Sequence, residues 1–230
     1  MLQELDREIR GEVSKILATS YLKYKERRLY RAISRIFDVI LASLVLFVTF
    51  PTMIIIAGLI FFSNGGPILF KQKRLGKNGK PFTIYKFRTM RKDAEIILKE
   101  DKDLYKKYIE NDYKLPPNED PRLVNFGGFL RSSSLDELPQ LFNVLRGDMS
   151  HVGPRPIVPA ELERYSGHER EFLSVTPGLT GLWQVSGRSD IEYPQRKYLD
   201  LLYVENQSLF LDFKILVKTA FIVLSRSGAH

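Results

Sequence analysis

The sequence VILASLVLFVTFPTMIIIAGLIFF, residues 39–62, decides the fold of this chain, because it is uncharged and has Pro51 in its middle. It belongs to an uncharged run that ends at Phe70. Its 24 residues are enough to cross a bilayer once, since about 20 apolar residues suffice. The run starts too late and is too long for a cleavable signal peptide. It therefore predicts a membrane-embedded segment.

Both flanks of this run are basic. Residues 21–35 carry six Lys or Arg against one acid, and residues 71–92 carry nine with no acid. Basic flanks favour the cytoplasmic side, so a segment that enters, breaks at Pro51 and returns keeps both flanks there. One spanning helix with a kink at Pro51 is the alternative. Asp38, at the edge of the run, is expected to pair with Arg35 one helical turn earlier.

Composition limits the partners and the chemistry. The 230 residues carry a net charge of +8, which favours anionic partners such as lipid headgroups, phosphorylated substrates or nucleic acid. There is no cysteine, so disulfides and thiolate metal sites are excluded. The histidines lie far apart, at His151, His168 and His230, and form no metal-ligand pattern. We expect a bacterial inner-membrane protein whose polar part is cytosolic.

The remaining periodicity predicts an α+β chain that is mainly helical, organised as a monotopic membrane protein. We expect an amphipathic helix at residues 1–30, a re-entrant helix–break–helix at residues 31–66 and a cytosolic domain at residues 67–230. The first helix could lie on the membrane, pack on the domain or pair with a second copy. A homodimer is therefore among the expected assemblies.

Within the cytosolic part, residues 68–75 and 82–90 alternate in polarity and are joined by GKNGK, residues 76–80. Asn-Gly between alternating stretches predicts a β-hairpin, here a very basic one near the membrane surface. The glycine-rich residues 176–188 are predicted to form a substrate-lining loop. Helices are expected over residues 91–112, 135–145, 159–173 and 208–225, the last of them amphipathic and suited to the membrane interface.

The best catalytic candidates are two adjacent acids, Asp136 and Glu137, within SSSLDELP, residues 132–139. Ser134 and Glu137 have the spacing of a helix capping box, and acids at a helix N-terminus are stabilised by the helix dipole. A catalytic interpretation competes with this structural one. The positive end of a helix keeps an aspartate ionised, which suits a nucleophile or a metal ligand. Spacing leaves both interpretations open.

Basic side chains that could bind phosphate are plentiful. An arginine offers a bidentate fork to phosphate oxygens, although a solvated surface charge is the alternative at each position. Arg155 lies between two prolines and Arg188 follows the glycine-rich loop, so the backbone is constrained at both. The candidates are Lys86, Arg88, Arg131, Arg155 and Arg188.

Seven sequence blocks follow one another along the chain: RIFD (35–38), FKQKR (70–74), KFRTM (86–90), DPR (120–122), SLDELPQLFNVL (134–145), VGPRP (152–156) and PGLTGLWQVSGR (177–188). In this order they resemble the catalytic domain of the bacterial polyprenyl-phosphate sugar-1-phosphate transferases, the monotopic phosphoglycosyl transferases. The resemblance covers roughly residues 31–228. Residues 181–190 and 226–230, with the insertion 100–119, are most similar to the branch of undecaprenyl-phosphate galactose phosphotransferases.

The resemblance implies a reaction. A UDP-sugar, galactose or glucose in the first instance, gives its sugar-1-phosphate to undecaprenyl phosphate and releases UMP, as a first membrane step of exopolysaccharide or O-antigen synthesis. Family members proceed through a covalent phosphosugar–enzyme and use Mg²⁺. Asp136 matches the nucleophile, and Glu137 its partner acid, which binds the metal or accepts a proton. The five basic candidates match basic family positions. An N-acetylated or deoxy sugar is the alternative donor.

The resemblance also implies the re-entrant topology, with its membrane break at Pro51. Here the chain departs from the family pattern, because Phe50 precedes the proline where members often have a small hydroxyl residue. Thr49 or Thr52 could supply that hydroxyl to freed backbone carbonyls. Many relatives carry further membrane-spanning segments at the N-terminus, so the chain is expected to be a short form reduced to the catalytic unit.

Two functions of another class compete with the transferase. A membrane-tethered nucleic-acid-binding protein could use the basic residues 71–92, but the sequence shows no recognised nucleic-acid module, so no nucleic-acid partner is expected. A non-catalytic scaffold could pair copies through its N-terminal helix. The expected partners of the transferase are a UDP-sugar, undecaprenyl phosphate and membrane lipid.

Overall fold

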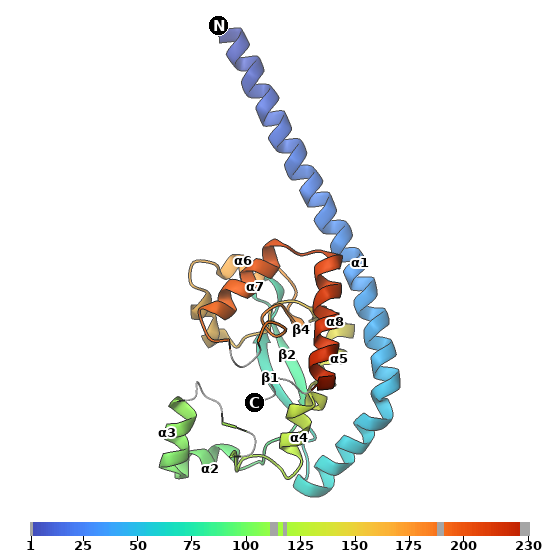
Figure 1. Ribbon diagram of the computed structural model, residues 1–230, viewed down its shortest axis with the longest axis vertical. Helices are drawn as coiled ribbons and strands as arrows, with labels where there is room; N and C mark the ends of the chain where they lie inside the picture. The colour runs from blue at the N-terminus through green and yellow to red at the C-terminus, as the bar shows by residue number, and fades with distance from the viewer. Residues whose placement is uncertain (1, 111–114, 117–118, 188–190, 226–230) are drawn as a thin grey trace. The chain divides into compact units, whose positions relative to one another are not determined.

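The computed structural model describes residues 2–110, 115–116, 119–187 and 191–225, with side chains from residue 28 to residue 223. The chain divides into two compact units, residues 1–37 and residues 38–230. The elements are α1 (Leu2–Asn64), β1 (Leu69–Leu75), η1 (Lys77–Gly79), β2 (Pro81–Phe87), α2 (Ala94–Glu100), α3 (Lys102–Glu110), α4 (Gly127–Ser132), η2 (Leu135–Glu137), α5 (Gln140–Arg146), β3 (Ser150–Val152), η3 (Pro159–Tyr165), α6 (Glu169–Leu173), β4 (Gly178–Thr180), α7 (Gln195–Glu205) and α8 (Leu209–Ser225). The architecture is mainly helical with two small sheets (Figure 1); the sequence predicts the helical character and the β1–β2 hairpin, but not the β3–β4 sheet.

Helix α1 carries the apolar run. Its part from Arg28 to Asn64 is long and apolar enough to cross a membrane: the most apolar window within it has a mean hydropathy of 2.6, and only 22% of that window is buried. Pro51 lies inside the helix, and Figure 1 shows that the axis of α1 bends, so that its cyan end points in another direction than the part before it. The Thr49 hydroxyl donates to the carbonyl of Val45, 2.7 Å away. The return of the segment to its side of entry stays a prediction.

Strands β1 and β2 pair antiparallel, with Leu69 opposite Phe87 and Leu75 opposite Pro81. The tight turn between β1 and β2 is possible because Asn78 and Gly79 both have left-handed backbone angles, with φ of 57° and 74°, which these two residue types tolerate best. One face of β2 is buried. It joins one core with α5 and with the inner side of residues 42–60 of α1.

The second sheet, β3 with β4, is parallel and short, with Ser150 opposite Gly178 and Val152 opposite Thr180. Tyr203 of α7 is buried against it and donates from its hydroxyl to the carbonyl of Val152. Helix α8 forms where residues 208–225 predict a helix. It buries Ile215 in this core and exposes a row of aromatic side chains, Phe210, Phe213 and Phe221.

Three predicted helices are interrupted. Residues 135–145 contain η2, a turn at Leu138 and Pro139, and the start of α5. Residues 91–112 contain α2 and α3, because the Asp101 carboxylate accepts hydrogen bonds from the amides of Asp103 and Leu104 and starts a new helix. Residues 159–173 contain η3 and α6, separated at Gly167, where φ is 82°. A single continuous helix over any of these three ranges was therefore the wrong prediction, and in each case a local backbone turn outweighs the apolar periodicity.

Candidate active site

The acid pair lies in a tight turn between two helices. Ser134 has a left-handed backbone, with φ of 58°, and η2 follows it at once. Pro139 is the N-cap of α5, a position where the missing proline N–H costs little. The capping-box interpretation of Ser134 and Glu137 is wrong, because the Ser134 side chain makes no capping hydrogen bond. The acids are thus available for other contacts.

Glu137 is held by a lysine from the β-hairpin. The Nζ of Lys86, on β2, lies 2.5 Å from Oε1 of Glu137, and both side chains keep part of their surface accessible, 19% and 26%. The β-hairpin therefore brings one predicted basic residue onto the predicted acid pair. Hydrogen bonds between an ammonium and a carboxylate are charge-assisted and stronger than bonds between neutral groups.

The two carboxyls differ in their electrostatics. Burial raises the pKa of Asp136 to about 6, against the positive charge of Lys86 and with Glu137 adding to the rise. Burial alone would raise the pKa of Glu137 too, but Lys86 and Arg155 outweigh it and lower that pKa to about 2. Neighbouring carboxyls with separated pKa values are suited to different roles in one reaction. Glu137 is ionised at neutral pH, and Asp136 is the more easily protonated of the two.

Two further predicted cations lie close enough to influence the pair. Arg155 is exposed and acts electrostatically on Asp136 and Glu137. Arg131, from α4, donates from Nε to the hydroxyl of Thr89 at 2.9 Å. Burial lowers the pKa of Arg131, whereas Asp136 opposes that change. Lys86, Arg131 and Arg155 thus surround the acid pair with positive charge, as phosphate binding requires.

The other two predicted cations differ from these three. Arg88 is buried, and its Nη2 donates to the carbonyls of Asn64 and Gly65 at 3.1 and 2.5 Å, at the end of α1. These hydrogen bonds give Arg88 a structural role, and its role as a phosphate ligand stays a prediction. Arg188 lies outside the described residues.

Sequence reasoning did not single out Arg74 of β1. Its Nη1 donates to the carbonyl of Pro156 and to Glu161, at 3.1 and 3.4 Å. Burial lowers the pKa of Arg74, Arg155 lowers it further, and Glu161 and then Glu137 oppose this change. Arg74 is thus a further partly buried cation that interacts electrostatically with Arg155 and Glu137, although its direct partner is Glu161. The alternating polarity of β1 indicates that its side chains point to two faces, but it does not show which of its basic residues faces the acid pair.

Two buried acids were also missed or misassigned. Asp200 of α7 accepts a hydrogen bond of 2.7 Å from the Tyr165 hydroxyl, and burial raises the pKa of Asp200 to about 7. Asp38, expected beside Arg35, accepts hydrogen bonds from the Ser150 hydroxyl and the His151 amide, at 3.1 and 2.9 Å. Both acids pair with residues far along the chain, so spacing gave no signal for either.

The metal prediction can be compared with the donors present. Among the described residues there is no cluster of three or more His, Cys, Asp or Glu side chains that could hold a metal ion. Asp136 and Glu137 offer two carboxylates, and Mg²⁺ is commonly held by one or two carboxylates together with substrate phosphates. The donor set therefore fits Mg²⁺ bound jointly with a diphosphate, and does not fit a metal caged by protein alone.

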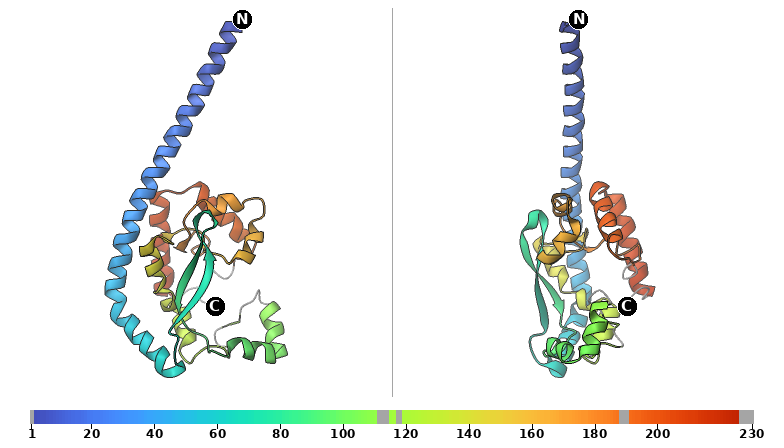
Figure 2. Two further views of the ribbon diagram at one scale, coloured as in Figure 1. Left: turned by 180° about the vertical axis from the view of Figure 1, so that it is seen from behind. Right: turned by 90° about the vertical axis from the view of Figure 1, so that its left-hand side faces the viewer.

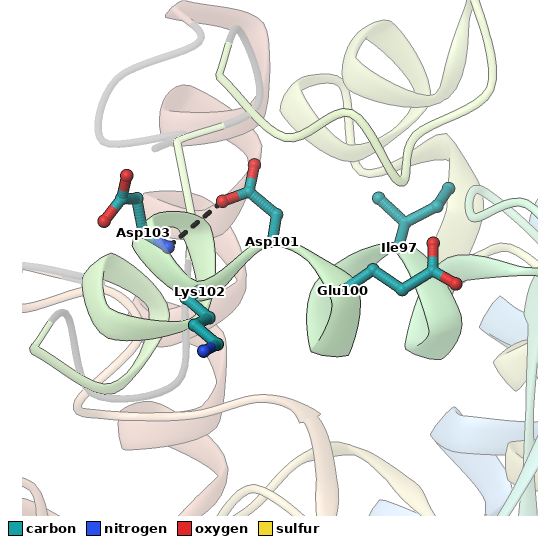
Figure 3. A pocket seen from close by; sticks show the side chains of 5 residues that line it. All are labelled: Ile97, Glu100, Asp101, Lys102 and Asp103. Atoms are coloured by element: carbon teal, nitrogen blue, oxygen red, sulfur yellow. Dashed lines mark hydrogen bonds between the residues drawn. The ribbon is translucent and has the colours of Figure 1, made fainter.

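A pocket of about 620 Å³ lies elsewhere, on the inserted helices α2 and α3 (Figure 3). It is lined by Ile97, Glu100, Asp101, Lys102 and Asp103. Asp101 points its carboxylate at the amide of Asp103, 3.1 Å away, so its charge is used to start α3. None of the predicted site residues lines this pocket.

Comparison with known proteins assigns the chain to a protein family. The sequence profile described as bacterial sugar transferase matches residues 29–226, which include the acid pair and its surrounding cations. The chain belongs to the bacterial sugar transferase family. Family membership favours the enzyme over the nucleic-acid-binding and scaffold alternatives. The first 28 residues of this sugar transferase lie outside the match.

Several relatives are similar over most of this chain. It is 46% identical over 207 residues to the undecaprenyl-phosphate galactose phosphotransferase of Salmonella typhimurium, covering 89% of this chain and 43% of the relative. It is 44% identical over 200 residues to the exopolysaccharide production protein ExoY of Rhizobium meliloti, covering 85% and 87%. It is 38% identical over 197 residues to the UDP-glucose:undecaprenyl-phosphate glucose-1-phosphate transferase of Klebsiella pneumoniae, covering 81% and 39%. The chain thus spans about two fifths of the first and third relatives and most of the second.

Proposed function

We propose that this sugar transferase moves a hexose-1-phosphate from a UDP-sugar to undecaprenyl phosphate and releases UMP. The observation that carries the proposal is the buried Asp136 next to Glu137, whose carboxylate is paired with Lys86 at 2.5 Å. The names of the relatives in Salmonella and Klebsiella support undecaprenyl phosphate as the acceptor and galactose or glucose as the sugar. Transfer to a membrane lipid also agrees with the apolar segment of α1.

The reaction is proposed to have two displacements at phosphorus. In the first, a carboxylate oxygen of Asp136 attacks the β-phosphorus of the UDP-sugar, and the bond to the bridging oxygen breaks, so that UMP leaves with that oxygen. In the second, a phosphate oxygen of the lipid attacks the same phosphorus. The bond to Asp136 breaks, the carboxylate is regenerated, and the lipid carries the sugar through a diphosphate.

The surrounding residues have separate roles in this scheme. Lys86, Arg131 and Arg155 orient the diphosphate and stabilise charge that develops on its oxygens. Asp136 and Glu137 would hold Mg²⁺, which would neutralise charge on the diphosphate when bound. Glu137 keeps Lys86 in place.

The wild-type chain can be tested directly for this activity. Purified protein in vesicles is given undecaprenyl phosphate, Mg²⁺ and one sugar nucleotide from a panel of UDP-galactose, UDP-glucose, UDP-N-acetylhexosamines and UDP-deoxysugars. We expect UMP release that depends on the lipid for turnover and is fastest with galactose or glucose. Chelation of Mg²⁺ is expected to stop it. No UMP with any sugar nucleotide would refute the proposed function.

The membrane arrangement is proposed to be re-entrant, with the catalytic part on the cytoplasmic face of the inner membrane. Because the chain has no cysteine, single cysteines report topology without background. We expect Ala32→Cys and Lys73→Cys, both at exposed positions, to react with a membrane-impermeant maleimide from the same side of sealed vesicles. Phe50→Cys should be protected on both sides. Labelling of the first two from opposite sides would establish a spanning helix instead.

A homodimer through residues 1–30 stays a prediction. The sequence pattern that suggests it lies in a part of α1 whose side chains are outside the described set.

A further inference from the structure

The apolar segment of α1 is held at both ends by a buried charged side chain. At its start, Asp38 is 5% exposed, and its Oδ1 accepts from the Ser150 hydroxyl and the His151 amide and lies 3.0 Å from Nδ1 of His151. A carboxylate only accepts, so Nδ1 of His151 carries the proton in this contact. Three donors therefore converge on a single oxygen of Asp38. The partners are 112 and 113 residues away in sequence.

At the other end, Arg88 is 8% exposed and binds the carbonyls of Asn64 and Gly65. Asn64 is the last residue of α1, so its carbonyl is one of those that a helix leaves unpaired at its C-terminus, where a cation is also favoured by the helix dipole; Gly65 follows the helix directly. The Asn64 side chain adds a hydrogen bond of 3.2 Å to the carbonyl of Met90. Figure 2 shows that the open end of the β1–β2 hairpin, opposite its turn, lies next to the cyan end of α1.

Each of these contacts connects to a different side of the active site. Arg88 follows β2, two residues after Lys86, whose amine binds Glu137. His151 lies in β3, four residues before Arg155. The path from His151 to Arg155 is tightly packed, because the amide of Gly153 donates to Thr180 and a Cβ at Gly153 would come within 2.5 Å of the carbonyl of Thr176.

We propose that Asp38 and Arg88 are positioning residues for transfer to the lipid. They fix the two ends of the apolar segment to the two strands that lead to Arg155 and Lys86. The depth of that segment in the bilayer then sets the height of Asp136 relative to the phosphate of a bilayer-embedded acceptor. A small change in that height is costly, because displacement of reacting groups by about 1 Å can lower a rate about 10²-fold. This inference rests on the proposed function and assigns a role in it to residues outside the acid pair.

The test compares two acceptors. Asp38→Ala removes the shared acceptor of Ser150 and His151, and we expect its rate with undecaprenyl phosphate in vesicles to fall about tenfold or more. Its rate with a short, water-soluble polyprenyl phosphate in detergent should change less than about threefold, because that acceptor reaches Asp136 without a bilayer. Asp38→Asn retains an acceptor oxygen and should restore most of the vesicle rate. His151→Ala, which keeps the backbone amide, should move the ratio of the two rates in the same direction by less.

A matched control separates positioning from stability. Thr219→Val removes the hydrogen bond of 2.8 Å between Thr219 on α8 and Thr180 on β4, which does not involve the apolar segment. It should leave the ratio of the two rates unchanged. Equal losses with both acceptors in Asp38→Ala would show a merely structural residue and overturn the proposal, as would full activity with both.

A second readout does not depend on catalysis. A donor dye on Lys99→Cys, an exposed position on α2, and an acceptor dye on lipid headgroups report the height of the catalytic part by energy transfer. We expect a lower or broader transfer efficiency in Asp38→Ala than in the parent, and an unchanged one in Thr219→Val. An unchanged efficiency in Asp38→Ala would overturn the inference. If the wild-type chain transferred no sugar to either acceptor, the proposed function would fail, while this measurement would still decide whether Asp38 fixes the segment.

Discussion

Replacing Asp136 with asparagine is expected to lower sugar-phosphate transfer at least about 10³-fold, because the amide cannot form the acyl-phosphate bond that the proposed first displacement requires. Asparagine is nearly isosteric with aspartate, so the turn after Ser134 and the contact of Lys86 with Glu137 should persist. The measurement is UMP release with undecaprenyl phosphate in vesicles. A single-turnover reaction with labelled UDP-sugar and no lipid should leave label on the wild-type chain and none on Asp136→Asn.

The control for this substitution is Asp93→Asn. Asp93 is a half-buried acid paired with Arg91 at 2.8 Å, and it is not among the groups that act on Asp136 or Glu137, so its removal changes net charge by the same amount without altering a contact of the acid pair. We expect Asp93→Asn to retain wild-type turnover and labelling. Label that survived in Asp136→Asn would identify another nucleophile, and full turnover in that variant would exclude Asp136 from the chemistry.

The parts of the fold that the sequence predicts are those set by neighbouring residues. The apolar run of residues 39–62 predicts a long apolar helix, and Asn78-Gly79 between alternating stretches predicts the β-hairpin, and both are found because both signals are local. The same local reasoning failed at residues 132–139. There the capping-box spacing is real, but Lys86 takes the Glu137 side chain instead, at a sequence separation of 51 residues.

Long-range polar contacts account for the rest of what spacing could not predict. Asp38 lies one helical turn after Arg35, so its position in the sequence predicts an ion pair with Arg35. In the structure Asp38 is buried and accepts hydrogen bonds from Ser150 and His151. Arg88 lies in a basic block that suggests phosphate binding, but its guanidinium reaches the end of α1. Whether a charged side chain faces a ligand or a backbone carbonyl depends on tertiary packing, which a single sequence does not state.

Replacing Lys86 with methionine is expected to lower kcat/KM about 10²-fold at neutral pH, since the site loses a cation that stabilises both Glu137 and the substrate phosphates. The pKa shifts give the sign of a further effect. Burial raises the pKa of Asp136, and Lys86 is the largest influence that opposes this rise. Without Lys86 the pKa of Asp136 rises further and that of Glu137 rises too, so a smaller fraction of Asp136 is ionised at pH 7.

The acidic limb of the kcat/KM profile, which reports groups of the free enzyme, should therefore move to higher pH in Lys86→Met, and activity should partly recover as the pH is raised. Lys86→Arg keeps the charge beside Glu137 and should leave the limb near its wild-type position, although its different geometry lowers the rate. If Lys86→Met lost activity equally at every pH, Lys86 would act on the substrate alone. Its contact with Glu137 would then have no part in keeping Asp136 ionised, and the electrostatic coupling proposed for this acid pair would be wrong.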